Sequence, residues 1–289
     1  MRTYLDCIPC LMNQALRTAR LTTGNEKTIK SILDQVGTLV KTVSMEDPPP
    51  KTARSVYRII SASTGNKDPY RELKARNTQT ALELYPRLRK RIRRSDDPLL
   101  TAIRLAIAGN VIDFGVHESV DIQKEIDLRL NQELAISDVD AFTAALSATD
   151  EILYIGDNAG ETVFDRLLIE VLAKPVRYVV RSAPVINDAT YSDAVKAGLD
   201  QVATLMRSGA DAPGTVLEQC SPDFIDTFNR STMVISKGQG NFEALSDVMA
   251  PVFFLLIAKC PIIARDIGVN VGDMILKGPA AEDWTKVMR

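Results

Sequence analysis

The 289-residue sequence has few of the residues on which most zinc sites and secreted scaffolds depend. It contains one histidine, which excludes a three-His zinc site, an HExxH helix and a two-His iron triad. Its four cysteines are too few for a disulfide scaffold in a chain of this length. The formal charge is 35 − 37 = −2, which gives no electrostatic argument for a dedicated nucleic-acid binder. Any chemistry must therefore rest mainly on carboxylates, amides, lysines or hydroxyls.

Long hydrophobic runs are also absent from the sequence. The longest one covers residues 251–258, far short of the roughly 20 residues that a membrane span needs. The first residues, MRTYLDCIPCLMNQ, are interrupted by Asp6 and Asn13 and contain no apolar core of signal-peptide length. We therefore expect a cytoplasmic protein with no membrane partner, whose cysteines are reduced.

The hydrophobic pattern changes near residue 148 and predicts two parts, a helical N-terminal region over 1–147 and an α/β core over 148–289. In the first part, apolar residues recur at three- and four-residue spacing, which is typical of helices, over 25–43, 70–94, 98–114 and 117–134. In the second part, short apolar runs predict strands at 152–155, 176–180, 202–206, 233–236 and 253–257. Helical patterns lie between the strands, as at 162–173 and 242–249. This alternation predicts an α/β protein with a Rossmann-like, mainly parallel sheet.

The residues that follow each predicted strand are candidates for function, because open parallel sheets bind ligands beyond the carboxyl ends of their strands. After strand 152–155 comes the segment GDNAGE, which contains Asp157 and Asn158 and leads into a helix. The amino end of a helix suits an anion, and nearby carboxylate and amide oxygens favour a divalent cation that bridges protein and phosphate. Alternatively, Asn158 and Glu161 form a capping box and Asp157 is a helix cap.

Two later strand ends carry similar polar residues. Asp188 follows strand 176–180, and it would supply a carboxylate to the same cation if the two strands are neighbours. Its alternative role is to cap a helix that begins near Ala189. Lys237, after the strand at 233–236, precedes Gly238 and Gly240. A lysine charge next to glycines that expose backbone N–H groups favours phosphate binding, whereas the simpler interpretation is a flexible loop with a surface lysine.

Three further features leave more than one interpretation open. Asn110 and Asp113 lie one helical turn apart at the end of an apolar stretch, where they either end the helix or line a cleft. Cys7 and Cys10 form one CxxC motif, which is structural, related to a metal, or redox-active. The basic run 87–94 is a solvated helix face or a contact for an anionic partner.

These elements together, in this order, resemble the DUF89 family, the damage-control phosphatases with an ARMT1-like domain. The residues that carry the resemblance are GDNAGE, Asp188, SKGQGNFE, the NxxDFG element at 110–115 and the N-terminal CxxC motif. The CxxC motif is similar to that of subfamily I, and the resemblance extends from Cys7 to Asp273. It implies a helical part packed on a Rossmann-like core, and a metal-dependent phosphatase. The implied substrates are phosphate monoesters of small metabolites: sugar phosphates, damaged or surplus phosphometabolites, or phosphopantetheine-type compounds.

The resemblance also implies roles for individual residues. The metal, which would be Mn, Mg, Co or Ni, is expected on Asp157, Asn158 and Asp188. Catalytic roles are expected for Asp157, Lys237 and Glu161. The substrate, a small phosphorylated metabolite, is expected to contact the following residues: Asn110, Asp113, Gly160, Lys237, Gly238 and Asn241. The sequence does not indicate an oligomeric state.

Two other functions remain as alternatives. One is a carboxyl methyltransferase that uses S-adenosylmethionine, since some relatives in the family have been described in that way. The absence of a GxGxG loop after the first predicted strand counts against it. The other is a non-catalytic sensor that holds a metal and a phosphorylated ligand.

Overall fold

The computed structural model describes residues 1–110 and 122–279 of the chain. Its α-helices are α1 (Cys7–Thr22), α2 (Glu26–Val40), α3 (Pro49–Thr64), α4 (Arg71–Arg94), α5 (Pro98–Ala108), α6 (Ile122–Asn131), α7 (Val139–Ala148), α8 (Thr162–Leu172), α9 (Tyr191–Lys196), α10 (Pro222–Arg230), α11 (Gln239–Leu245) and α12 (Pro261–Ile267). Its strands are β1 (Leu134–Ser137), β2 (Ile152–Ile155), β3 (Val176–Val180), β4 (Thr204–Arg207), β5 (Val234–Lys237), β6 (Val252–Ile257) and β7 (Met274–Lys277). Short 3₁₀ turns lie at Leu199–Gln201 and Leu217–Gln219.

The strands form one seven-stranded sheet in the order β1-β7-β6-β5-β2-β3-β4. Strands β2 to β6 run parallel to one another, while β7 is antiparallel to β6 and parallel to β1. The predicted α/β class with a mainly parallel sheet is therefore confirmed. Chain order along the sheet reverses at β2, which lies between β5 and β3. In sheets of this kind the crevice at the reversal is the usual ligand site.

Local sequence signals explain where several helices begin and end. The side chain of Asp97 accepts a hydrogen bond from the Leu100 backbone N–H at the start of α5, and proline occupies the first turn, as predicted. Asn25 caps α2 in the same way, through the N–H groups of Lys27 and Thr28. Helix α3 ends at Gly65, which takes a left-handed conformation with φ 73°.

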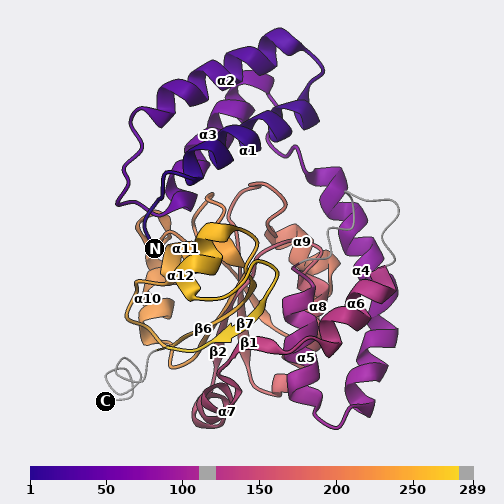
Figure 1. Cartoon of the computed structure of the whole chain (residues 1–289). Coiled ribbons are helices and arrows are strands. Elements are labelled where there is room, and N and C mark those ends of the chain that lie inside the picture. The colour runs from indigo at the N-terminus through magenta and orange to yellow at the C-terminus, as the bar shows by residue number, and fades with distance from the viewer. Residues whose placement is uncertain (111–121, 280–289) are drawn as a thin grey trace.

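Helices cover both faces of the sheet (Figure 1). One face packs against α4, α5, α8 and α9, in an apolar core with Phe164 and Leu255 among its fully buried side chains. The other face packs against α10, α11 and α12, around Phe224 and Phe242. Burial on both faces explains why β2 and β6 read as continuous apolar runs rather than alternating ones.

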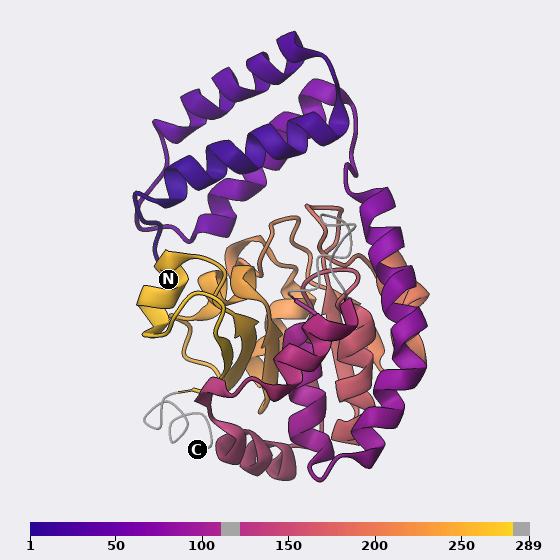
Figure 2. The same cartoon turned by 45° about the vertical axis from the view of Figure 1, so that its right-hand side comes forward.

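Helices α1, α2 and α3 form a separate bundle at one end of the molecule (Figure 2). The bundle has its own apolar core, which includes Ile32, Val36 and Ile60. Two arginines of α3, Arg54 and Arg58, both bind Asp211, which follows β4. The bundle therefore sits at the carboxyl ends of the strands, where the predicted functional residues lie.

Two strands were not predicted from the sequence, β1 and β7. Strand β1 lies inside the region 1–147 that was expected to be helical, so the sheet begins before the predicted boundary. The residues of β1 are alternately half-buried and exposed, and the strand is four residues long, so its apolar signal is weak. Within the described residues, no helix is both long and apolar enough to span a bilayer.

Replacing Leu255 with alanine is expected to lower the free energy of unfolding by about 2–5 kcal/mol, because Leu255 is fully buried in the middle of β6. Urea unfolding followed by circular dichroism measures the change. The matched control is Leu128→Ala on α6, where the leucine is 59% exposed and the loss should stay below about 0.5 kcal/mol. Equal losses in the two variants would contradict the assigned core.

Candidate active site

The residues predicted at the strand ends meet at the reversal point of the sheet. Asp157 and Asn158 lie just beyond β2, and Gly238 lies just beyond its neighbour β5. Asp188 follows the other neighbour, β3, and its backbone is bridged to that of Asn158. Backbone hydrogen bonds join the two loops, from Ala189 N to Asp157 O at 2.7 Å and from Ala159 N to Asn187 O at 2.8 Å. Strands β2 and β3 are therefore neighbours, as a cation site shared by Asp157 and Asp188 requires.

The helix-cap alternatives for these polar residues do not hold. Helix α8 begins at Thr162 with Glu161 at its N-cap position, and no side chain caps it. Helix α9 is capped by a reciprocal pair, Thr190 and Asp193, rather than by Asp188. Asp157, Asn158 and Asp188 are thus available for another purpose.

Two asparagine amides bind the carboxylates after β2. Asn110 Nδ2 donates to Asp157 Oδ2 at 2.8 Å and to Glu161 Oε2 at 2.7 Å. Asn158 Nδ2 contacts the same two oxygens at 3.0 and 3.2 Å. Burial, together with the nearby charges of Asp188 and Glu161, raises the pKa of Asp157 to about 8. The surroundings of Asp157 thus disfavour its charged form, despite the two amide hydrogen bonds.

The guanidinium group of Arg181 holds the Asp188 carboxylate in place. Its Nε donates to Asp188 Oδ2 at 2.7 Å, and both side chains are almost completely buried. The other two guanidinium nitrogens bind Thr215 Oγ1 and Asn241 Oδ1. Burial raises the pKa of Asp188 even though the arginine acts in the opposite direction. Arg181 therefore orients Asp188 while leaving its other oxygen, Oδ1, for a further partner.

The structure places Lys237 differently from the expected phosphate-binding loop. Lys237 is the last residue of β5 and has no exposed surface. Its ammonium donates to Glu161 Oε1 and Asp165 Oδ1, each at 2.5 Å, and to Ala106 O at 2.8 Å. Although burial opposes the charge, Asp165 and Glu161 raise the pKa of Lys237 above its usual value. All three N–H donors are used, so contact with phosphate would require one of these bonds to break.

The network continues below Lys237 into the core. The hydroxyl groups of Tyr154 and Tyr178 donate to Asp165 at 2.8 and 2.7 Å, and their rings stack with centroids 5.2 Å apart. Burial raises the pKa of Asp165, and Lys237 counteracts that shift. Glu161 is therefore held through Lys237 by a fully buried set of partners.

Glycines at two predicted positions allow close packing around the carboxylates. Gly238 has φ 79°, and a Cβ there would lie 1.9 Å from Asp157 Oδ2. A Cβ on Gly160 would lie 2.9 Å from the Cβ of Asn77 on α4. Side chains at these positions would separate β5 and α4 from the carboxylate loop.

The predicted substrate residue Asn241 is fully committed to internal bonds. Its Oδ1 accepts from Arg181, from Thr215 N and from Thr215 Oγ1, and its Nδ2 donates to Gly156 O and Lys237 O. The side chain therefore ties β5 to the loops after β2 and β3. Asp113, the other residue predicted with Asn110, lies outside the described residues.

A cavity of about 490 Å³ opens beside the carboxylates. Asn110, Asn158, Gly160 and Glu161 line it, together with residues that the sequence did not indicate: Asn77, Gly109, Arg129, Asn187, Ile257, Ala258, Lys259, Val271 and Gly272. Lys259 Nζ donates to the backbone oxygen of Asn110 at 2.6 Å. Arg129 and Lys259 bring positive charge to the cavity, Glu161 is the acidic residue in its lining, and of the three expected metal ligands Asn158 alone lines it.

The donor set at the strand ends fits a hard divalent cation. Asp157, Asn158 and Asp188 offer carboxylate and amide oxygens, which Mg²⁺ and Mn²⁺ prefer. Asn110 Oδ1 beside them is buried and has no hydrogen-bond partner. Across the described ranges, no group of three or more His, Cys, Asp or Glu side chains is arranged to hold a metal ion.

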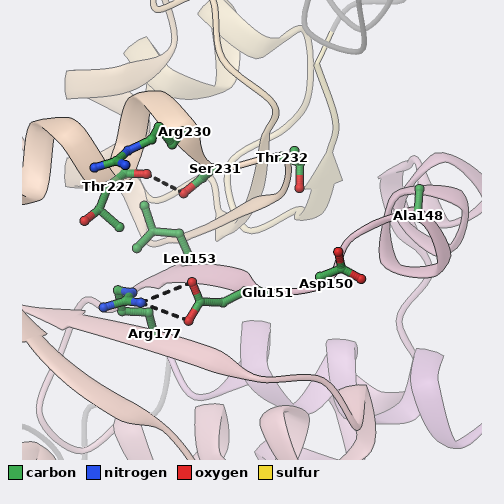
Figure 3. Close-up of a pocket in the computed structure, with 9 residues that line it drawn as sticks. All are labelled: Ala148, Asp150, Glu151, Leu153, Arg177, Thr227, Arg230, Ser231 and Thr232. Carbon is green, nitrogen blue, oxygen red and sulfur yellow. Dashed lines mark hydrogen bonds and ion pairs between the residues drawn. The ribbon is translucent and has the colours of Figure 1, made fainter.

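A second hollow, of about 570 Å³, lies at the amino ends of β2 and β3, on the side of the sheet away from the carboxylates (Figure 3). Glu151, just before β2, pairs there with Arg177 of β3 at 3.1 Å. Because this hollow lies at the amino ends of the strands, it is remote from the carboxylates. A substitution in it is therefore a suitable control for a substitution among them.

The two N-terminal cysteines lie on the first turn of α1, Cys7 half-buried and Cys10 exposed. Neither forms a disulfide, and Cys220 and Cys260 are also free thiols. Burial raises the pKa of the Cys7 thiol, which disfavours the reactive thiolate.

Comparison with known proteins identifies the class to which this fold and site belong. The model of the damage-control phosphatase ARMT1-like domain matches residues 3–275, so the chain belongs to that family. Three archaeal relatives are similar over nearly their whole length. An uncharacterized protein of Methanocaldococcus jannaschii is 34% identical and covers 94% of this chain and 93% of its own.

The other two relatives are named damage-control phosphatases. The one from Archaeoglobus fulgidus is 33% identical, with 94% of this chain and 97% of its own covered. The one from Pyrococcus horikoshii is 32% identical, with 95% and 97% covered. The crystal structure of a DUF89 family protein from Pyrococcus horikoshii is 31% identical and superposes with a TM-score of 0.90, over 96% of this chain and 99% of that one. The resemblance to the DUF89 family is confirmed.

The stability of the metal-free protein should fall as the pH rises from about 4 to about 8. The unfolded chain releases the Asp157 proton near its ordinary pKa of 3.8, while the folded protein retains it up to about 8. Ionisation therefore favours unfolding within that window. Asp157→Asn should make the decline shallower by up to about 1.4 kcal/mol per pH unit. Urea unfolding in EDTA measures both slopes, and identical slopes would contradict the raised pKa.

Lys237→Met should lower the free energy of unfolding by about 3–5 kcal/mol, because it leaves Glu161 and Asp165 buried without their cation. Thermal and urea unfolding test this prediction. Lys30→Met is the control, since Lys30 and its partner Asp34 are exposed and their pair contributes less than about 1 kcal/mol. A loss as small as that of the control would show that the buried charge is not required.

Proposed function

We propose that this protein is a metal-dependent phosphatase that hydrolyses phosphate monoesters of small metabolites. The observation that carries the proposal is the pair of carboxylates at the reversal point of the sheet, half-buried Asp157 and buried Asp188, next to the amino end of α8. The two relatives named damage-control phosphatases support it. Their name favours damaged or surplus phosphometabolites as the substrate class.

Asp157, Asn158 and Asp188 are the residues proposed to hold the divalent cation, Mn²⁺, Mg²⁺, Co²⁺ or Ni²⁺. When bound, the cation would neutralise phosphate charge and lower the pKa of a water molecule. Burial raises the pKa values of Asp157 and Asp188, and this supports the assignment because a bound cation would favour their charged forms.

The phosphate is proposed to bind at the amino end of α8. The amino end of a helix carries a partial positive charge, and Gly160 lets the loop approach closely. The N–H groups of Thr162 and Phe164 already donate to Ala159 O and Glu161 O, so this charge supports the proposal more than free donors do. Lys259 supplies positive charge on the other side of the cavity. Phosphoryl transfer depends mainly on such charge neutralisation and positioning.

The roles proposed for Glu161 and Lys237 follow from their contacts. Asn110 and Asn158 hold Glu161 Oε2 beside Asp157, within reach of the cavity. Lys237 holds the other oxygen, Oε1, and is a positioning residue for Glu161. Glu161 is therefore the candidate to orient or accept a proton from an attacking water.

Hydrolysis of p-nitrophenyl phosphate with each of the four metals tests the proposal. Asp188→Asn should lower kcat/KM by at least about 100-fold, since it removes a charged ligand while keeping the shape. Asp150→Asn is the matched control, because Asp150 lies in the hollow at the amino ends of the strands (Figure 3). Removal of its charge should leave activity unchanged. An inactive wild type with all metals, or an active Asp188→Asn variant, would overturn the proposal. Binding of S-adenosylmethionine instead would favour the methyltransferase alternative.

A further inference from the structure

A third cavity, of about 240 Å³, lies between the α1–α3 bundle and the loop after β3. Its walls come from helices α1 and α3, from the connection 66–70 before α4, and from residues 183–186 and Asp211 of the core. Cavities between two units of a fold are frequent ligand sites, and this volume suits a small metabolite. None of the residues predicted for catalysis, metal or substrate lines it, so the proposed phosphatase site does not account for it.

Positive charge predominates in the lining of this cavity. Arg54, Arg58 and Lys67 contribute three cations and Asp211 contributes one anion, so the lining carries a net charge of 3 − 1 = +2. Although burial acts in the opposite direction, the two arginines lower the pKa of Asp211, which therefore stays charged. The ammonium of Lys67 forms no hydrogen bond or ion pair with any residue that the structure describes.

The two arginines also keep N–H groups that nothing in the fold uses. Asp211 accepts from Nε of Arg54 and from Nε and Nη2 of Arg58. Both Nη groups of Arg54 and Nη1 of Arg58 make no hydrogen bond within the described ranges. They are not sealed in the interior, since the side chains of Arg54 and Arg58 are 27% and 60% exposed. A guanidinium group with free N–H donors is suited to a carboxylate or phosphate group.

The remainder of the lining is largely apolar and aromatic. Tyr57 of α3 contributes its ring, and the loop after β3 contributes Pro184, Val185 and Ile186. A molecule with a small apolar body and one acidic group matches both parts of the lining.

Ile186 connects this cavity with the proposed metal site. Its φ of 43° lies in the left-handed region, which β-branched residues rarely adopt, and such strain is common at ligand-binding positions. The Asp188 N–H donates to Val185 O at 3.1 Å and closes a turn over 185–188. Asn187, between Ile186 and Asp188, lines the cavity beside the carboxylates. A molecule packed against Val185 and Ile186 therefore contacts the turn that carries Asp188.

We propose that this third cavity binds a small molecule through a carboxylate or phosphate group on Arg54, Arg58 and Lys67, and that its occupation changes the rate of the reaction at Asp188. The binding stands without the proposed phosphatase function, whereas the effect on rate rests on it. Because the two cavities adjoin the same turn, the anionic group belongs either to the far end of the phosphate ester or to a separate effector.

Isothermal titration calorimetry of the full chain tests the binding, with benzoate and phenylphosphonate as anionic probes and benzamide as the neutral control. The protein is metal-free and dialysed into buffer without phosphate or chelator, so that the acidic residues after β2 do not hold an anion. At least one anion should bind with a Kd of about 1 mM or lower. Benzamide should bind at least about tenfold more weakly, because it lacks the charge. Failure of both anions to bind overturns the proposal.

The double variant Arg58→Gln/Lys67→Gln removes two cations of the cavity and keeps the pair between Arg54 and Asp211. It should raise the Kd of the anion at least about tenfold. Lys67→Gln alone is the second variant if the double variant fails to fold. The matched control is Lys27→Gln/Lys41→Gln, which removes the same charge from two exposed lysines outside the cavity and should change Kd less than about twofold. An unchanged Kd in the cavity variants, or an equal rise in the control, overturns the site.

Hydrolysis of p-nitrophenyl phosphate by the metal-loaded protein, with and without the anion that binds, distinguishes the two sources. An anion that occupies the place of the far end of the ester raises KM and leaves kcat unchanged, whereas a separate effector changes kcat. Either effect should be absent in Arg58→Gln/Lys67→Gln. Rates that do not change at a saturating concentration of the anion overturn the coupling. A protein that binds the anion but hydrolyses no ester with any metal overturns the phosphatase function and the coupling, while the binding site stands.

Discussion

The buried ammonium of Lys237 is the interaction on which the rest of the site depends. It joins three elements, because it lies on β5, binds Glu161 and Asp165 at the start of α8, and donates to a carbonyl of α5. A charge without solvent must keep its partners, so these elements are held in one arrangement. As a result, one oxygen of Glu161 is fixed below and the other faces Asp157 and the cavity.

The acidic groups of the site differ in how their charge is balanced. Lys237 balances Glu161 and Asp165, and Arg181 balances Asp188. Asp157 has amide partners, and no ion pair to it occurs among the described residues. Burial, together with the charges of Asp188 and Glu161, raises the pKa of Asp157 to about 8. The free protein thus carries a local electrostatic cost at the point where a bound cation would remove it, a common arrangement in binding sites.

The fold places Asp157 at the carboxyl end of β2, where ligands can reach it. The order of the strands reverses at β2, and the cavity there is lined by residues that follow β2, β3 and β6. Helix α4 closes one side through the contact between Asn77 and Gly160, and the α1–α3 bundle sits over the same end of the sheet. At the amino ends of the strands, polar side chains such as Glu151 and Arg177 bind each other.

The fold class, strands 152–155 and 176–180, and the polar residues after them can be predicted from the sequence, because they depend on local apolar runs and on the general rule for parallel sheets. It missed the short strands β1 and β7, whose pairing joins distant segments. Tertiary structure alone decided that Lys237 is buried rather than exposed in a loop, that Arg181 supports Asp188, and that Asn77 of α4 reaches the cavity. The Lys237 and Asn77 contacts join residues more than 70 positions apart, and the Arg181–Asp188 pair depends on the burial of two charges, neither of which a local pattern encodes.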